Sequence, residues 1–167
     1  NEFLASLSIF KSPVLEFEEQ YLTIKEEDQP HKKLTYFYSD PSVVQSPTKT
    51  ITMPSEEVKF HLDMNKLLEM KRAAGVIGSP DMVLQKSSGN SSLLVKDKKN
   101  DTANNYSSDI KTDGDGEYKF FFKVENLKLF DGDYDVKISS KNISHFKNDK
   151  SNIEYWIALE PESTYSN

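Results

Sequence analysis

Apolar and polar side chains alternate in Val58-Lys59-Phe60-His61-Leu62, and the pattern returns in the same phase 60 residues later in Tyr118-Lys119-Phe120-Phe121-Phe122-Lys123. A period of two predicts a strand with one buried face. Both stretches run directly into apolar residues at helical spacing, around Leu67 in the first and Leu127 in the second. A strand that leads into a short helix is therefore made twice from one template, and a repeat of this kind largely determines the architecture of a chain.

A third copy of the repeat is expected at the start of the chain. Asn1-Glu2-Phe3-Leu4 fits the register of Asn65-Lys66-Leu67-Leu68, so the chain is expected to begin inside a repeat, at its helix, with the preceding strand missing. Each repeat has the predicted order β-α-β-β-β. One such unit cannot bury both its sheet face and its helix stripe, so two repeats are expected to pair into one domain, with the sheets outside and two helices side by side.

The remaining elements follow from periodicity and from turn residues. Helices are expected over residues 1–10, 64–74 and 124–130, with Asp63 as the N-cap and Gly75 as the end of the second helix. Strands are expected over residues 14–18, 21–25, 34–38, 57–62, 82–85, 93–96, 106–111, 118–123, 134–139, 143–147 and 153–159. A charged hairpin loop is expected at residues 26–33, and the tail after Glu160 is expected to be polar and frayed.

A proline-bearing segment separates two domains. Residues 40–55 contain Pro41, Pro47 and Pro54, and this density of proline suppresses both helix and central strand. We interpret the segment as an extended interdomain connector. Residues 1–39 are then the C-terminal half of a first domain whose front part is missing, and residues 56–167 are the second domain.

Composition limits the possible functions. The chain has 167 residues, a net charge of −6 and no cysteine, which excludes disulfides, zinc–thiolate sites and thiol nucleophiles. No apolar run approaches the roughly 18 residues that span a membrane, and the first residues are neither a signal peptide nor an ordinary start. The 10 Phe and 8 Tyr argue against disorder. The acidic total argues against nucleic acid, although the distribution of charge matters more than its sum.

Four stretches carry a resemblance to a known family. They are Asn1-Glu2-Phe3-Leu4-Ala5-Ser6-Leu7-Ser8, Asp40-Pro41-Ser42-Val43-Val44, Asp63-Met64-Asn65-Lys66-Leu67-Leu68 and Tyr155-Trp156-Ile157-Ala158-Leu159-Glu160-Pro161-Glu162-Ser163-Thr164. With the tandem repeats and the connector, they make the chain resemble the DNA sliding clamps of T-even-type bacteriophages over essentially its whole length. The family has four repeats per subunit, whereas this chain has two and a half.

The resemblance implies an α+β fold of tandem β-α-β-β-β units that form DNA-clamp domains, with antiparallel sheets outside and helices lining a ring pore. It implies a homotrimer that encircles duplex DNA without reading its sequence and tethers the replicative DNA polymerase for processive synthesis. An ATP-dependent clamp loader would place it on DNA in the cytoplasm of the infected bacterial host. The resemblance implies no catalytic activity and no membrane.

A clamp needs cations that meet phosphates without reading bases, and lysines on pore helices suit this task. Segments 63–75 and 123–130 each carry a net charge of +1, so the remainder of the chain carries −8. We predict that the DNA-facing residues are Lys66, Lys71, Arg72, Lys123 and Lys128, although Lys71 projects toward the apolar stripe of an ideal helix. The alternative is that these are ordinary solvated side chains on helices.

The resemblance also implies a pocket for a short terminal peptide of the polymerase, where the connector crosses the sheet near the end of the chain. The positions that match this pocket are Val43, Val44, Ala158, Leu159 and Pro161. A second interpretation, compatible with the first, is that Val43, Val44 and Leu159 pin the connector and the strand end in place.

No residue pattern predicts catalysis, a cofactor or a metal site. His31, His61 and His145 lie in different predicted elements without a partner at helical spacing. The Asp-rich turns at residues 113–117 and 131–135 begin like calcium loops but lack the Gly and Glu that such a loop needs, so we interpret them as hairpin turns. The chain is therefore predicted to be non-enzymatic. Trp156 is assigned to the domain core.

One hypothesis of another class is retained: a phage structural or attachment β-protein that uses its sheets for assembly or glycan contact. An attachment protein would need an exposed aromatic cluster on a sheet face or loop tip. A clamp instead needs basic helices gathered on one surface.

Overall fold

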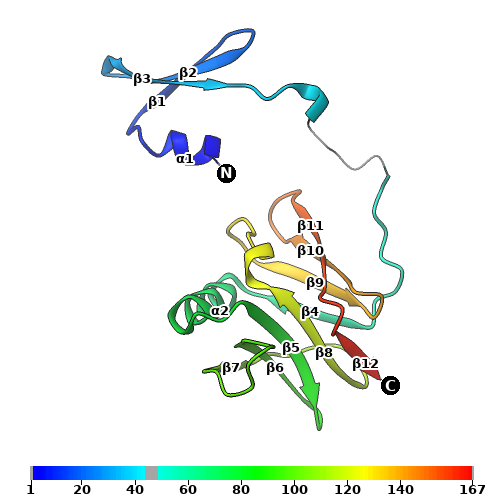
Figure 1. Ribbon diagram of the computed structural model, residues 1–167. Helices are drawn as coiled ribbons and strands as arrows, with labels where there is room; N and C mark the ends of the chain where they lie inside the picture. The colour runs from blue at the N-terminus through cyan, green and yellow to red at the C-terminus, as the bar shows by residue number, and fades with distance from the viewer. Residues whose placement is uncertain (1, 44–48, 167) are drawn as a thin grey trace. The chain divides into compact units, whose positions relative to one another are not determined.

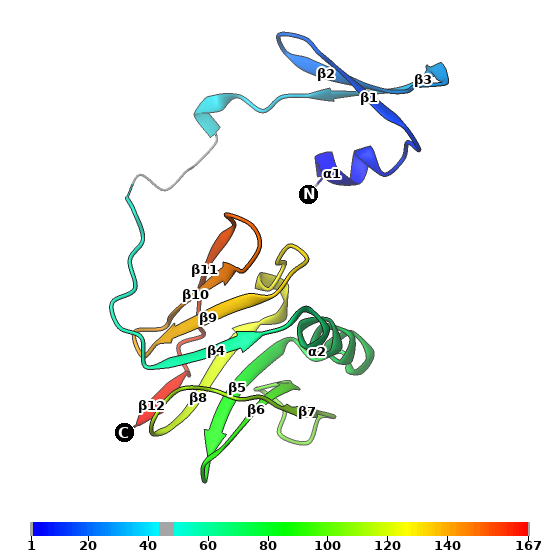
Figure 2. The same cartoon turned by 180° about the vertical axis from the view of Figure 1, so that it is seen from behind.

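The computed structural model describes residues 2–43 and 49–166. The chain divides between Thr50 and Ile51 into an N-terminal unit, residues 1–50, and a C-terminal unit, residues 51–167. Figure 1 and Figure 2 show the two units from opposite sides.

The N-terminal unit is a three-stranded antiparallel sheet with one short helix. Its elements are α1 (Glu2–Leu7), β1 (Pro13–Phe17), β2 (Tyr21–Glu26), β3 (Gln29–Phe37) and the 3₁₀ turn η1 (Pro41–Val43), and the strand order is β1-β2-β3. Leu22 and Ile24 of β2 are buried with Phe10, and the half-buried side chains of Phe3 and Leu7 from α1 pack against them. The helix is thus shorter than predicted, but its apolar side chains lie on the sheet.

The charged hairpin loop predicted at residues 26–33 is wrong, because β3 begins at Gln29. Glu26, which is assigned to this loop, is instead the last residue of β2, and its carboxylate is buried. It accepts hydrogen bonds from the backbone N–H groups of Lys11 and Ser12 at 2.9 and 2.6 Å and from Lys32 Nζ at 3.3 Å. These hydrogen bonds offset the free-energy cost of burying the charged Glu26 side chain in a strand. Pro30 is tolerated because β3 is an edge strand.

The C-terminal unit contains two antiparallel sheets. Its elements are β4 (Val58–Leu62), α2 (Met64–Ile77), β5 (Asp81–Ser87), β6 (Asn90–Lys96), β7 (Tyr106–Asp109), β8 (Glu117–Lys123), the 3₁₀ turn η2 (Val124–Asn126), β9 (Tyr134–Ser139), β10 (Ile143–Asn148), β11 (Glu154–Ala158) and β12 (Thr164–Ser166). A four-stranded sheet has the order β11-β10-β9-β4, and a five-stranded sheet has the order β12-β8-β5-β6-β7. Their apolar faces and α2 contribute to one core, which includes Phe60, Leu67, Phe120 and Tyr134.

The two repeats exchange their first strands. β4 pairs with β9 of the following repeat, with Phe60 opposite Val136, and β8 pairs with β5 of the preceding repeat, with Phe120 opposite Leu84. Neither sheet therefore belongs to a single repeat. Because each leading strand completes the other repeat's sheet, the paired repeats fold as one body, which confirms the expected pairing of two repeats into one antiparallel domain.

α2 begins where the sequence predicts and ends later. The side chain of Asp63 accepts a hydrogen bond from the Lys66 backbone N–H at 2.8 Å, which caps the helix start. The predicted stop at Gly75 is wrong: the helix continues to Ile77, and Gly78 at φ +68° is the C-cap. Gly78 adopts the left-handed conformation that a helix end favours and that glycine tolerates without strain.

Two other predictions in the C-terminal unit are wrong. The helix expected over residues 124–130 is only the turn η2. Leu127 and Leu129 follow the turn and are both buried, and this spacing of two residues does not form the apolar stripe of a helix. The unit therefore has one α-helix among its described residues, not two side by side. The tail expected to fray instead forms β12, which pairs with β8 and places Tyr165 opposite Tyr118.

Candidate functional site

α2 presents two unpaired cations at its surface. The helix buries Leu67, Met70 and Ala74 against the core, which leaves Arg72 exposed and Lys71 half-buried. Neither cation forms an ion pair with an acidic side chain among residues 2–43 and 49–166. Lys71 lines an open hollow of about 540 Å³ whose other wall comes from η2 and includes Lys123 and Val124. α2 and the turn η2 therefore border the same hollow, with Lys71 on one side and Lys123 on the other.

Lys66 is engaged within the protein. Its Nζ donates to Ser108 Oγ of β7 and lies 3.3 Å from Glu69 Oε2. Glu69 in turn accepts a hydrogen bond from the Tyr106 hydroxyl at 2.7 Å, and this bond, with help from Ser108 and Lys66, lowers the pKa of the Glu69 carboxyl. Lys66 thus ties α2 to the edge strand β7, and its charge is largely neutralised there.

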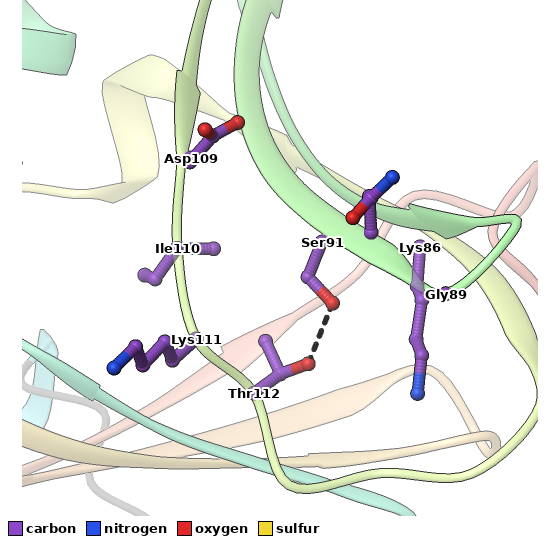
Figure 3. A pocket seen from close by; sticks show the side chains of 8 residues that line it. Lys86, Gly89, Ser91, Asp109, Ile110, Lys111 and Thr112 are labelled. Atoms are coloured by element: carbon purple, nitrogen blue, oxygen red, sulfur yellow. Dashed lines mark hydrogen bonds between the residues drawn. The ribbon is translucent and has the colours of Figure 1, made fainter.

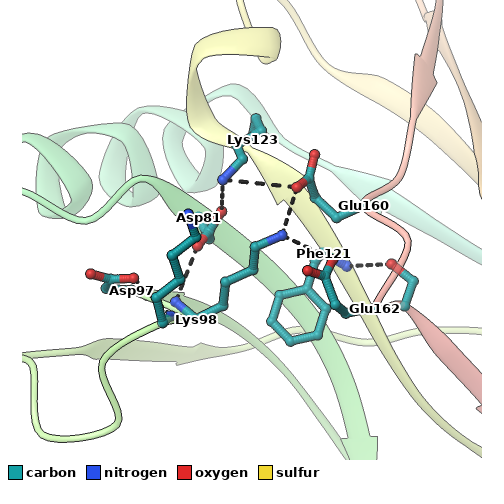
Figure 4. A network of polar contacts seen from close by, with 9 residues as sticks. Asp81, Asp97, Lys98, Phe121, Lys123, Glu160 and Glu162 are labelled. Carbon is teal, nitrogen blue, oxygen red and sulfur yellow. Dashed lines mark hydrogen bonds and ion pairs between the residues drawn. The ribbon is translucent and has the colours of Figure 1, made fainter.

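Lys123 belongs to the polar network in Figure 4. Its Nζ lies 2.7 Å from Oδ1 of Asp81, a carboxylate that is 1% exposed, and 3.8 Å from Glu160 Oε2. The hydrogen bond to Asp81 raises the pKa of Lys123. The second lysine of the network, Lys98, donates to Glu160 at 2.6 Å and to Glu162 at 2.9 Å, and these bonds raise its pKa to about 12.

The network has a structural consequence. Lys98 and Lys123 hold Glu160 and Glu162 at the start of the C-terminal tail, and the Glu160 backbone N–H donates to the Phe121 carbonyl at 2.9 Å. The Phe121 N–H donates to Ser163 Oγ at 3.0 Å just before β12 begins. Lys123 therefore fixes the tail along β8. Of the five predicted DNA-facing residues, only Lys71, Arg72 and the exposed Lys128 carry charges that no described acidic side chain pairs.

The outer face of the four-stranded sheet carries an aromatic and basic row. Strand register places Trp156 opposite His145, His145 opposite Lys137, and Lys137 opposite Lys59. The Trp156 and His145 rings stack with centroids 4.2 Å apart. The assignment of Trp156 to the core is wrong, because its neighbours Tyr155 and Ile157 face the core and successive strand side chains point to opposite faces.

The predicted pocket residues fall into different environments. Ala158 is exposed on the outer face, two residues beyond Trp156 and opposite Ile143, and Pro161 is exposed in the tail. Leu159 is 6% exposed and lies in the core cluster, so it pins the strand end as the second interpretation expected. Val43 is 67% exposed in η1 of the N-terminal unit. Val44 lies outside the described residues.

Sequence reasoning missed two hollows that β7 borders. The larger, about 830 Å³, is lined by Lys86, Ser91, Asp109 and Thr112, among others, and Figure 3 shows Ser91 and Thr112 hydrogen-bonded to each other. Their hydroxyls lie 2.8 Å apart, and Thr112 also bonds the Tyr118 hydroxyl at 2.5 Å. These polar groups satisfy one another, so they brace the segment after β7.

The second hollow is apolar and lies between α2 and β7. It encloses about 560 Å³ and is lined by Leu68, Ala73, Val76, Ile77 and Tyr106, together with polar neighbours that include Arg72. The Leu68 and Val76 side chains are 49% and 79% exposed. Among the described strands, β7 pairs with β6 alone, so its outer backbone edge is open beside the hollow. The exposed leucine and valine at i and i+8 could have signalled this surface.

A model of the gp45 sliding clamp C-terminal domain matches residues 59–161. The chain belongs to the gp45 sliding-clamp family. The sliding clamp of Vibrio phage KVP40 is 28% identical over 165 residues, which cover 95% of this chain and 73% of the relative. Family membership makes the chain a processivity clamp of DNA replication and not an enzyme, as the sequence predicted, and it gives no support to the structural or attachment hypothesis.

Solved clamps share the fold of this gp45-type clamp. A PCNA2–PCNA3 complex from Sulfolobus tokodaii aligns with a TM-score of 0.60 at 14% identity, over 96% of this chain and 71% of that chain. A. fulgidus PCNA, bound to the C-terminal region of FEN-1, aligns with a TM-score of 0.54 at 19% identity, over 90% of this chain and 64% of that chain. This chain spans about two fifths of the bacterial clamp chains with this fold. No described helix is long and apolar enough to cross a membrane.

Proposed function

We propose that this clamp chain assembles with two further copies into a ring that encircles duplex DNA and tethers the replicative DNA polymerase. An ATP-dependent loader opens and closes the ring on DNA in the cytoplasm of the infected bacterial host. The observation that carries the proposal is family membership over residues 59–161, joined to a helix, α2, that carries unpaired cations in an otherwise acidic chain.

The DNA-facing surface is the side of α2 that meets η2, and Arg72 marks its border with the hollow between α2 and β7. Lys71, Arg72 and Lys128 supply the charges, because the ammonium groups of Lys66 and Lys123 are already bonded to protein groups. Cations that contact only phosphates hold a duplex without fixing its register, which a sliding protein requires. The acidic remainder of the chain disfavours DNA on its other surfaces.

Replacing both Lys71 and Arg72 by alanine is expected to lower the affinity for DNA. It is also expected to make that affinity less dependent on salt concentration. The slope of log K against log salt concentration should fall by about 0.9 for each phosphate that no longer has a cationic partner. The measurement is duplex binding of the assembled protein across a salt series. Lys66→Ala serves as the control, because Lys66 is bonded to Ser108 and Glu69 and its removal should leave the slope nearly unchanged. An unchanged slope in the double variant would rule out this surface.

The ring closes through the apolar hollow beside β7. A second copy suits this surface, because the N-terminal unit offers a matching pair of elements: the long edge strand β3 and, in α1, Leu4 at 57% exposure. β3 carries His31, Lys32 and Lys33, whereas the surface around β7 carries Glu69 and Asp109. Strand pairing between the open edges would satisfy their backbone groups and cover the apolar side chains.

Glutamate at both Leu68 and Val76 is expected to convert the ring to monomers, because two carboxylates would have to lose their hydration inside an apolar contact. Both side chains are exposed within one chain, so the free energy of unfolding should change by less than about 1 kcal/mol. Light scattering coupled to size-exclusion chromatography measures the mass. The control is Phe130→Glu, which places the same charge on an apolar side chain that is 60% exposed and outside the hollow. Intact oligomers of the double variant would contradict this interface.

The polymerase contact is the outer face of the four-stranded sheet near the chain end. Trp156 and Ala158 offer apolar surface, and Lys137 and Lys59 offer cations, although both lysines also contact Glu56 at 2.7 and 3.0 Å. A short peptide with an apolar anchor and an acidic residue fits this combination. A. fulgidus PCNA, which shares this fold, is bound by the C-terminal region of FEN-1.

Processive synthesis tests the proposed function. Polymerase, loader and ATP are supplied on a long primed template under single-turnover conditions for the polymerase, with and without the complete clamp subunit. The product length per binding event is expected to rise only when both clamp and loader are present. An unchanged product length would refute the proposal.

A further inference from the structure

A histidine and two aspartates converge on the outer face of the four-stranded sheet, beside Lys59 and Lys137 of the aromatic and basic row. His61 lies near the end of β4, Asp135 lies directly opposite it on β9, and Asp149 lies in the turn after β10. Their ligand atoms all lie within 4.8 Å of one another. Sequence spacing predicted no such group, because the three residues come from three separate segments.

The spacing of these atoms suits a metal ion. His61 Nδ1 lies 3.2 Å from Asp135 Oδ1 and 3.8 Å from Asp149 Oδ2. A tetrahedral zinc ion with ligand distances of about 2.1 Å separates its ligand atoms by about 3.4 Å, which falls between the two measured values. The donors would therefore need only small side-chain rotations to bind one ion.

The backbone holds the donors in place. Strand pairing fixes His61 opposite Asp135, and the Asp149 backbone N–H donates to the Asp133 carbonyl at 3.1 Å. The Asn148 side chain accepts the N–H groups of Lys150 and Ser151 at 2.9 Å each, which braces the turn that carries Asp149. A preformed set of ligands loses little conformational entropy on binding.

The charge around the site favours a cation. Among the described residues, Asp135 and Asp149 form ion pairs only with His61. Lys147 lies opposite Asp135 on the neighbouring strand but does not form an ion pair with it. Asp133 adds a third carboxylate nearby and accepts the Met64 N–H at the start of α2 at 2.8 Å. The imidazole nitrogen favours zinc and similar transition metals over magnesium or calcium, which prefer oxygen ligands.

We propose that His61, Asp135 and Asp149 form a binding site for one divalent transition-metal ion, with water completing the coordination. The ion links β4, β9 and the turn after β10, next to the residues that begin α2. It supplies a structural cross-link to the helix that bears Lys71 and Arg72, and the site stands independently of the proposed ring and DNA contacts.

Calorimetric titration of the untagged, chelator-treated protein with Zn²⁺ tests the site. One ion per chain is expected for the natural protein, with affinity at least tenfold weaker for His61→Ala and for Asp149→Asn. His31→Ala is the matched control, because His31 lies on β3 of the N-terminal unit, and it should bind zinc like the natural protein. Absence of stoichiometric binding, or equal affinity in His61→Ala, would overturn the proposal.

Two further readouts separate binding at this site from loss of folding. The His61 side chain is 52% exposed, so His61→Ala should have the circular dichroism spectrum and melting temperature of the metal-free natural protein. Zn²⁺ should raise the melting temperature of the natural protein by several degrees and leave that of His61→Ala unchanged. In NMR spectra, Zn²⁺ should shift the ring resonances of His61 and leave those of His31 in place. Unchanged His61 ring resonances in zinc would contradict the assignment.

Discussion

Replacing Trp156 by alanine is expected to weaken binding of the clamp to its polymerase about 30-fold or more. A buried aromatic anchor at an interface commonly contributes about 2 kcal/mol or more, which corresponds to that factor. Trp156 faces away from the core and stacks on His145, so the main effect should be on binding, and the missing stacking should lower stability by only about 1 kcal/mol.

Trp156 is the single tryptophan of the chain, so its fluorescence reports the binding of a polymerase terminal peptide directly. Calorimetry then compares the alanine variant with the natural protein. Lys147→Ala is the control, because Lys147 is an exposed residue of β10 two positions from His145 on the same face. Full affinity in Trp156→Ala would show that the polymerase binds elsewhere.

Replacing Asp81 by alanine is expected to destabilise the C-terminal unit by about 3 kcal/mol. The change removes a carboxylate that is 1% exposed, strips Lys123 of its closest partner, and leaves the Lys98 backbone N–H without its acceptor at 3.1 Å. Breaking a buried pair from one side costs about 3–5 kcal/mol, and the cost is reduced here because Lys123 is 26% exposed and keeps Glu160 nearby.

Urea unfolding followed by circular dichroism measures this change. Asp101→Ala is the control, because the Asp101 carboxylate is 94% exposed and pairs with Lys96 only at 3.5 Å, so its removal should cost less than about 0.5 kcal/mol. Equal stabilities of the two variants would contradict the role given to the network.

The sequence predicts those parts of this fold that depend on local patterns. Alternation in residues 58–62 and 118–123 correctly places β4 and β8, and Asp63 correctly marks the start of α2. The exchange of these two strands between sheets could not be predicted, because it depends on pairing between distant segments, such as Phe60 with Val136. The same limit explains β12, whose polar residues form a strand only because β8 offers them an open edge.

The candidate surfaces could likewise be predicted from the sequence only where they depend on local patterns. Charge along α2 predicts cations on its surface, and Arg72 is exposed there, but helical spacing could not reveal that Ser108 and Asp81, from other strands, bind Lys66 and Lys123. Trp156 was misplaced because a lone tryptophan in a strand is more often buried, and only the alternation with Tyr155 and Ile157 shows which face it occupies. Partners brought by long-range pairing therefore account for most of the corrections.

Encirclement of DNA is the central claim, and a topological test examines it most directly. The complete subunit is loaded by its loader onto a nicked circular plasmid, and the complex is passed through a gel-filtration column at high salt, where simple ionic contacts are screened. The clamp is expected to remain with the circular DNA and to be released when a restriction enzyme cuts the circle into a linear molecule. Equal retention on circular and linear DNA, or dissociation from both, would contradict the account.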